Sequence, residues 1–142
     1  MDAITRYAAK QAAELGMPPV GTLLHGRVEG WLAPTPENIE AARTFLLAEW
    51  RERAVEQGDP EPADLSGACI FGSVFAQCVF GGQLRGNWDH QFVEHPDAGP
   101  IDLVHPGFET DHDPTFWGRA EHRDKVASVL PRVARWVAEF KT

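Results

Sequence analysis

The feature that most constrains the fold is an apolar run over residues 67–80 with turn-forming residues at both ends. Ser66 and Gly67 precede the apolar residues, and Gly81 and Gly82 follow them. The run suits a helix of about three to four turns, and it is shorter than the roughly 18 apolar residues of a membrane span. The pattern predicts a buried helix over residues 67–80, against which the rest of the chain packs.

Helical spacing of apolar residues recurs in three other segments. Residues 2–15 predict a short helix that ends at Gly16. Residues 36–57 predict an amphipathic helix, with Thr35 as N-cap and Pro36 at the first helical position. Residues 119–140 predict a last helix whose apolar stripe docks into the core, and we expect Pro131 to kink or divide it.

The remaining segments predict a small sheet. We expect a strand near residues 83–86 and two more in "HQFVEH" and "PIDLVH", which a turn over residues 96–99 connects. Residues 17–34 are expected to be irregular with at most a short strand, and residues 106–118 to form a loop. The fold class expected is α+β, with helices packed on a small antiparallel sheet.

Length and charge limit the class of protein. The 142 residues suit one domain, 1–142, made of a helical N-terminal part (1–58), the cysteine helix with the small sheet (66–105) and the C-terminal helix (119–140). The net charge of −8 argues against a nucleic-acid surface. We expect no membrane partner, and a cytoplasmic location because the N-terminus lacks a signal-peptide pattern.

The two cysteines lie at opposite ends of the apolar run and predict different roles. Cys69 falls at the start of the expected helix, where the helix dipole and unpaired N–H groups favour a thiolate. Cys78 lies nine residues later, on the opposite side of the helix, and is expected to be a small buried hydrophobic residue. The pair therefore does not predict a metal clip or an internal disulfide.

Two later residues supply partners for a nucleophilic thiol. His90 opens the first of the two extended segments after Gly86, and Asp102 lies in the second. Their separation is even, so an odd-numbered turn places them on one face of the sheet. Direct pairing requires a turn centred near Pro96, whereas "PDAG" favours a slightly later centre. The residues predict a nucleophile, a base and an orienting carboxylate, in that order.

The ordered set of motifs resembles the transglutaminase-like branch of the papain-fold cysteine enzymes, including a group of small uncharacterised bacterial proteins. It comprises Gly67-x-Cys69, the Phe80–Gly82 stretch, His90 and the Ile101–Leu103 stretch, within residues 66–105. The resemblance implies a papain-like core in which Cys69 is the nucleophile, His90 its base and Asp102 the residue that orients His90. We therefore expect Cys69 to react well below pH 8.

One part of the implied machinery is missing. Papain-like enzymes have a glutamine shortly before the cysteine as an oxyanion donor, and "EPADLSGA" contains none. Asn87, Trp88 and Gln91 are candidate binding residues close to His90. Trp117 is a further candidate, either as an aromatic wall of a cleft or as a core residue.

Three functions are compatible with these residues. The first is thiol-dependent amide or acyl chemistry (hydrolysis, deamidation or acyl transfer) on a small-molecule, peptide or protein amide, without a cofactor. The second is a binding or regulatory module that keeps the scaffold without turnover. The third is a metal site in the loop rich in His and Asp, although its spacings match no recognised motif and we expect no bound zinc. The residues that this third interpretation uses are His105, Asp111, His112, Asp113 and His122.

Overall fold

The computed structural model describes residues 2–107 and 110–142, and it has an α+β fold. Its helices are α1 (Ala3–Glu14), α2 (Val20–His25), α3 (Pro36–Glu56), α4 (Cys69–Phe80), the 3-10 helix η1 (Phe116–Gly118) and α5 (Ala120–Lys141). Its strands are β1 (Val28–Glu29), β2 (Gly81–Gly86), β3 (Gln91–His95) and β4 (Gly99–Ile101). The expected fold class is thus confirmed.

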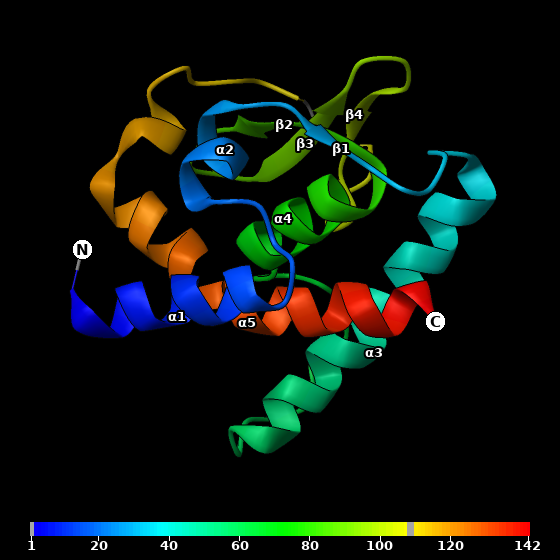
Figure 1. Ribbon diagram of the computed structural model, residues 1–142. Coiled ribbons are helices and arrows are strands. Elements are labelled where there is room, and N and C mark those ends of the chain that lie inside the picture. The colour runs from blue at the N-terminus through cyan, green and yellow to red at the C-terminus, as the bar shows by residue number, and fades with distance from the viewer. Residues whose placement is uncertain (1, 108–109) are drawn as a thin grey trace.

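The four strands form one antiparallel sheet in the order β1-β2-β3-β4. One face of the sheet rests on α4, and α4 in turn rests on α5, beside which α1 lies (Figure 1). The sheet, α4 and the α1–α5 pair are therefore successive layers. This arrangement places the N-terminus of α4 close to the start of β3.

Helix α4 is the centre of the molecule, as the apolar run predicts. Every residue from Phe71 to Phe80 is buried, and the helix contacts β2, β3 and α5. It begins at Cys69, two residues after the expected start. Within residues 2–107 and 110–142, no helix combines the length and apolar character needed to cross a lipid bilayer.

Two glycines allow β2 to begin directly after α4. Gly81 has a φ of 89° and Gly82 a φ of 119°, a region that residues with a side chain rarely adopt. A Cβ on Gly82 would lie 2.3 Å from the carbonyl oxygen of Glu94 on β3. The chain can therefore reverse from helix into strand here only because both residues are glycine.

The helix ends follow the expected capping rules. The Asp2 carboxylate accepts a hydrogen bond from Thr5 N (2.7 Å) at the start of α1, and Thr35 Oγ1 accepts from Asn38 N (3.2 Å) at the start of α3. Gly58, with a φ of 73°, follows the end of α3. These predicted boundaries are confirmed to within about two residues.

Some expectations about secondary structure were wrong. Residues 20–25 form α2 instead of irregular chain, and Leu23 and Leu24 of this short helix are buried in the core. Helix α5 continues through Pro131, so the proline does not divide the helix, while the expected kink stays a prediction. Val129, Leu130 and Val133 flank the proline and are all buried, so packing offsets the backbone hydrogen bond that proline removes.

Candidate functional site

Cys69 is the first residue of α4, and it is only partly buried. Ala68, the N-cap residue, makes no side-chain hydrogen bond to the first turn, so no cap occupies the N–H groups there. The backbone N–H groups of Cys69 itself and of Gln91 lie close enough to the sulfur to lower the pKa of the Cys69 thiol. The helix start therefore faces the start of β3 across this sulfur atom.

The electrostatics of Cys69 differ from the expectation. Partial burial raises the pKa of the Cys69 thiol above its ordinary value, and the negative charge of Asp102 raises it further. The two backbone N–H groups lower it, but by less than burial and Asp102 together raise it. The resting side chain is therefore a protonated thiol near neutral pH, and the expectation of a thiol with a lowered pKa was wrong for this state.

Cys78 lies in the last turn of α4 and is buried, as expected. Burial raises the pKa of its thiol to about 12. Cys78 therefore packs as a small apolar residue and does not act as a nucleophile at neutral pH.

Asp102 directly follows β4, close enough to Cys69 for its charge to affect the thiol. Its Oδ1 atom accepts hydrogen bonds from the backbone N–H groups of Val104 (3.1 Å) and His105 (2.9 Å). Its Oδ2 atom is buried and has no hydrogen-bond partner among the residues that the structure describes. One carboxylate oxygen thus shapes the turn, while the other remains available to a donor.

The strand register explains why Asp102 is not directly opposite His90. The β3–β4 pairs are Val93 with Ile101 and His95 with Gly99, so the turn is centred on Asp97. If this register is continued by one residue beyond β4, Asp102 lies opposite Phe92. His90 is two residues before Phe92, so His90 and Asp102 are diagonal neighbours and not a direct pair. The later turn centre that "PDAG" favours is correct, and the directly opposed His90–Asp102 pair is not formed.

His90 is buried and directly precedes Gln91, whose N–H contacts the sulfur. Its ring centroid lies 6.2 Å from that of Phe92 and 6.4 Å from that of His105. His105 therefore lies near His90, whereas the sequence suggested it only as a metal ligand. The signal for its position was local: an Asp side chain commonly binds backbone N–H groups two and three residues later, which keeps His105 beside Asp102.

The four expected binding residues have different environments. Gln91 presents its backbone N–H to the sulfur, while its side chain donates from Nε2 to the Asn87 carbonyl (2.7 Å). Both ends of the Asn87 side chain are engaged with backbone groups. Trp88 is 57% exposed, whereas Trp117 is buried and donates from Nε1 to the Arg85 carbonyl (3.1 Å). The core interpretation of Trp117 agrees with this burial.

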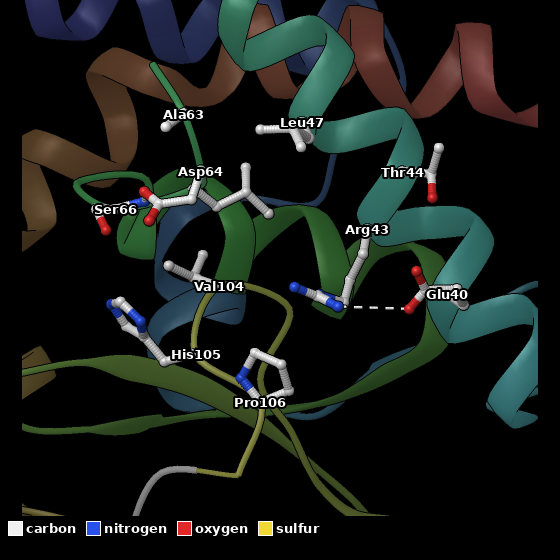
Figure 2. Close-up of a pocket in the computed structure, with 11 residues that line it drawn as sticks. Glu40, Arg43, Thr44, Leu47, Ala63, Asp64, Ser66, Val104, His105 and Pro106 are labelled. Atoms are coloured by element: carbon white, nitrogen blue, oxygen red, sulfur yellow. Dashed lines mark hydrogen bonds and ion pairs between the residues drawn. The ribbon is translucent and has the colours of Figure 1, made fainter.

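A cavity of about 360 Å³ lies between α3, the segment before α4 and the segment after β4 (Figure 2). Its polar lining includes Arg43, Asp64, Ser66 and His105, together with Glu40 and Thr44. The pKa of the Asp64 carboxyl is lowered, first by the hydrogen bond from Ser66 N and further by the nearby His105. Ser66 lies three residues before Cys69 in the chain, and His105 lies three residues after Asp102.

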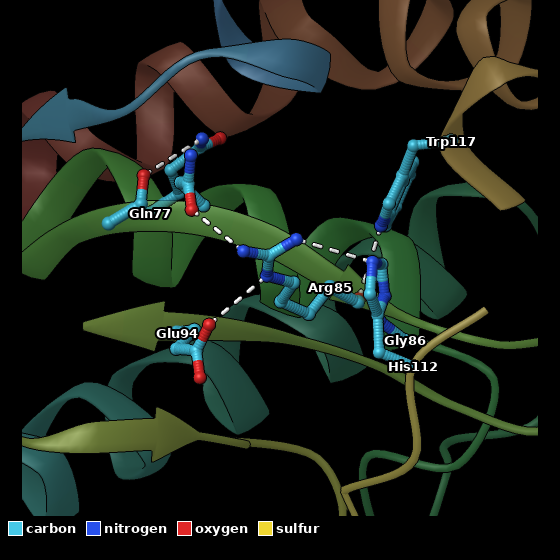
Figure 3. Close-up of polar contacts among 8 residues, drawn as sticks. Gln77, Arg85, Gly86, Glu94, His112 and Trp117 are labelled. Carbon is cyan, nitrogen blue, oxygen red and sulfur yellow. Dashed lines mark hydrogen bonds and ion pairs between the residues drawn. The ribbon is translucent and has the colours of Figure 1, made fainter. Parts of the chain in front are cut away.

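Residues 112 and 113 are hydrogen-bonded to Gly86 at the end of β2, and Figure 3 shows the contact between His112 and Gly86. Gly86 N donates to His112 Nδ1 (3.1 Å), and Asp113 N donates to the Gly86 carbonyl (2.9 Å). His112 Nε2 lies 3.3 Å from Arg85 Nη1. Arg85 itself donates to Glu94 on β3 (3.1 Å).

The histidines and acids expected as metal ligands are dispersed. His112 binds Gly86, and His122 stacks on Phe116 with ring centroids 3.8 Å apart. Over residues 2–107 and 110–142, no three His, Cys, Asp or Glu side chains are grouped so that they could hold a metal ion.

Comparisons with known proteins give no identification. No protein-family model matches the chain, and neither the curated proteins nor the solved structures contain a significant match.

Proposed function

We propose that Cys69 is the nucleophile of amide or acyl chemistry, with His90 as its base. The observation that carries the proposal is the placement of the sulfur at the first residue of α4, in contact with two backbone N–H groups. A thiol that is buried only for packing needs neither partial exposure nor two donors. We expect the same two N–H groups to stabilise the negative oxygen that develops during attack on a carbonyl.

The reaction begins from a protonated thiol. As Cys69 Sγ attacks the carbonyl carbon, the thiol proton moves to the His90 imidazole and the carbonyl oxygen becomes an oxyanion. The N–H groups of Cys69 and Gln91 stabilise that oxyanion, so a backbone group supplies the donor that the missing glutamine would have given. The imidazolium then protonates the leaving group, and an acyl-thioenzyme forms. Water or an amine releases the acyl group.

Asp102 contributes through its unpartnered oxygen. A buried carboxylate oxygen without a donor is costly, because the solvation it has lost is not replaced. The imidazolium formed during attack supplies a positive donor on the same side of the sheet. Asp102 therefore stabilises His90 after it has taken the proton.

The arrangement supports the resemblance to the transglutaminase-like branch of papain-fold enzymes. A cysteine begins a central helix, and the histidine and aspartate follow in that order at the ends of neighbouring antiparallel strands. The polar cavity beside Ser66 and His105 is where we place the substrate, a small-molecule, peptide or protein amide.

The test is the pre-steady-state reaction with p-nitrophenyl acetate. We expect a burst of nitrophenol of one equivalent per chain and a protein mass increased by one acetyl group. Cys69→Ala abolishes both, whereas the matched variant Cys78→Ala retains both. His90→Ala slows the burst by about 100-fold, the lower end of a general base's usual contribution. His105→Ala slows it less than His90→Ala does, because His105 is not the base.

The second candidate is a binding module that keeps this scaffold without turnover. The raised pKa of the Cys69 thiol favours it, because a resting thiol is a poor nucleophile. If the protein is such a binding module, we expect no burst of nitrophenol. The mass of the peptide that contains Cys69 should also stay unchanged after prolonged incubation with p-nitrophenyl acetate. That result would refute the enzymatic proposal.

A further inference from the structure

We propose that Asn87 is a positioning residue, which holds His90 and the Gln91 backbone N–H against Cys69. The inference rests on the proposed function, because it assigns Asn87 a role through the base and the oxyanion donor. Asn87 itself touches neither the substrate nor the reacting atoms in this proposal.

The first support is the turn that joins β2 to β3. Asn87 Oδ1 accepts hydrogen bonds from Asp89 N (2.8 Å) and His90 N (3.3 Å), and Asn87 N donates to the His90 carbonyl (3.0 Å). Both backbone groups of His90 are thus bonded to this single residue. The direction in which His90 leaves the turn is set by these contacts.

The second support is the link from Asn87 to Gln91. The Asn87 carbonyl accepts from Gln91 Nε2 at 2.7 Å. The Gln91 side chain is thereby held back against the turn, while the Gln91 backbone N–H is directed at the sulfur. Asn87 therefore controls two neighbouring residues with different roles at Cys69.

The third support is an anchor outside the turn. Asn87 Nδ2 donates to the Asp111 carbonyl (2.9 Å), and Gly86 binds residues 112 and 113 through both of its backbone groups. The turn therefore cannot shift without breaking bonds to a second segment of chain. Both polar ends of the Asn87 side chain are used in this way, so we assign Asn87 a positioning role in place of the binding role that the sequence favours.

The test measures the rate of Cys69 alkylation by iodoacetamide in the full chain, between about pH 6 and pH 9, with the modified residue identified by mass. The variants are Asn87→Ala and Asn87→Ser, because Ser keeps an oxygen that can accept from the same N–H groups without adding charge. His90→Ala is measured in parallel. Asn38→Ala is the matched control, since Asn38 also donates from Nδ2 to a backbone carbonyl (Ala33, 2.9 Å), at the start of α3.

We expect His90→Ala to slow alkylation near neutral pH by about tenfold or more. Asn87→Ala should slow alkylation by a similar factor and give the pH profile of His90→Ala. The reason is that a displacement of His90 by about 1 Å relative to the Cys69 sulfur has a large effect on the rate. Asn87→Ser should stay within about threefold of the unmodified chain, and Asn38→Ala within about twofold.

The outcomes separate the two proposals. If His90→Ala leaves the rate and its pH profile unchanged, His90 is not the base and the proposed function fails. A second outcome is that His90→Ala slows alkylation and Asn87→Ala does not, although circular dichroism shows that Asn87→Ala is folded. That outcome overturns the positioning role of Asn87. If Asn87→Ala does not fold, Asn87→Ser decides: a rate as low as that of His90→Ala overturns the assignment to the Asn87 side-chain oxygen.

Discussion

His122 shows how one side chain can make stability depend on pH. It is 7% exposed, it packs among Phe116, Trp88 and Trp117, and its Nε2 atom has no hydrogen-bond partner among the described residues. Burial lowers the pKa of His122 below its ordinary value of 6.5. The folded chain therefore holds this imidazole neutral under conditions in which the unfolded chain protonates it.

We predict that acidification destabilises the protein through His122. The contribution of the neutral imidazole is complete above pH 6.5, and it is lost as the pH falls below that value, because the unfolded state then binds a proton that the folded state excludes. His122→Phe should lose less stability between about pH 7.5 and pH 5 than the unmodified chain. Urea unfolding at the two pH values measures the difference.

The exposed His25 at the end of α2 provides the control. His25→Phe should keep the pH dependence of the unmodified chain. Equal pH dependence of all three proteins would show that His122 does not cause the loss.

The sequence predicts the position of individual site residues on their helices and strands better than it predicts which residues they contact in space. A small-residue turn before an apolar run is enough to place Cys69 at a helix start, and the prediction was confirmed. The contact of Cys69 with Gln91 N–H depends on where α4 docks against β3, and no local pattern encodes that docking. The offset between His90 and Asp102 depends on a turn centre that differs by one residue, which periodicity alone does not resolve.

At the level of elements, α5 is held to the molecule by one apolar stripe. Val126, Leu130, Val133 and Trp136 are buried, and the Trp136 ring lies 5.7 Å from that of Phe71 on α4. The last helix therefore closes the core on the side of α4 opposite to the sheet. This docking is as expected from the helical spacing of apolar residues.

We predict that Trp136→Ala lowers the free energy of unfolding by about 3–5 kcal/mol, because it removes a large buried side chain and leaves a cavity. Denaturant titration followed by circular dichroism measures the change. Tyr7→Ala, at an exposed position of α1, is the comparison and should change it by no more than about 0.5 kcal/mol. A similarly small effect of Trp136→Ala would mean that the stripe does not pack as described.

Helices with a strong apolar period were predicted, and the helices that were missed, α2 and η1, are short. Helix α2 contains Val20, Gly21 and Thr22, which are weak helix formers. Its support comes from elsewhere in the molecule, since Gln77 Nε2 on α4 donates to the Leu23 carbonyl at 2.9 Å. Tertiary contacts of this kind override local propensity, and they are absent from any window of sequence around residue 20.

At the level of the whole molecule, one cluster of buried side chains joins the layers. It extends from Ala12 on α1 through α4 and the sheet to Trp136 on α5, and Leu46 links α3 to the same cluster. The α+β class was predictable because the helical segments have apolar residues at helical spacing, whereas the strands are short extended segments bounded by turn residues. The order of the layers was not, because it depends on which face each element buries.

We predict that this shared core unfolds in one cooperative transition. The tryptophans lie in different parts of the fold, including Trp50 on α3, Trp117 on η1 and Trp136 on α5. Urea curves from tryptophan fluorescence and from far-ultraviolet circular dichroism should therefore have the same midpoint. Two separated midpoints would indicate that α3 or α1 unfolds independently of the rest.

The contrast between the two cysteines has a practical consequence. Cys69 is partly accessible in the native state, whereas Cys78 is buried in the last turn of α4 and its thiol has a pKa of about 12. Once Cys69 has been blocked, labelling of Cys78 requires the central helix to be exposed transiently. The ratio of that labelling rate to the rate in an unfolded peptide gives the equilibrium constant for opening, so the chain carries a built-in probe of its own fluctuations.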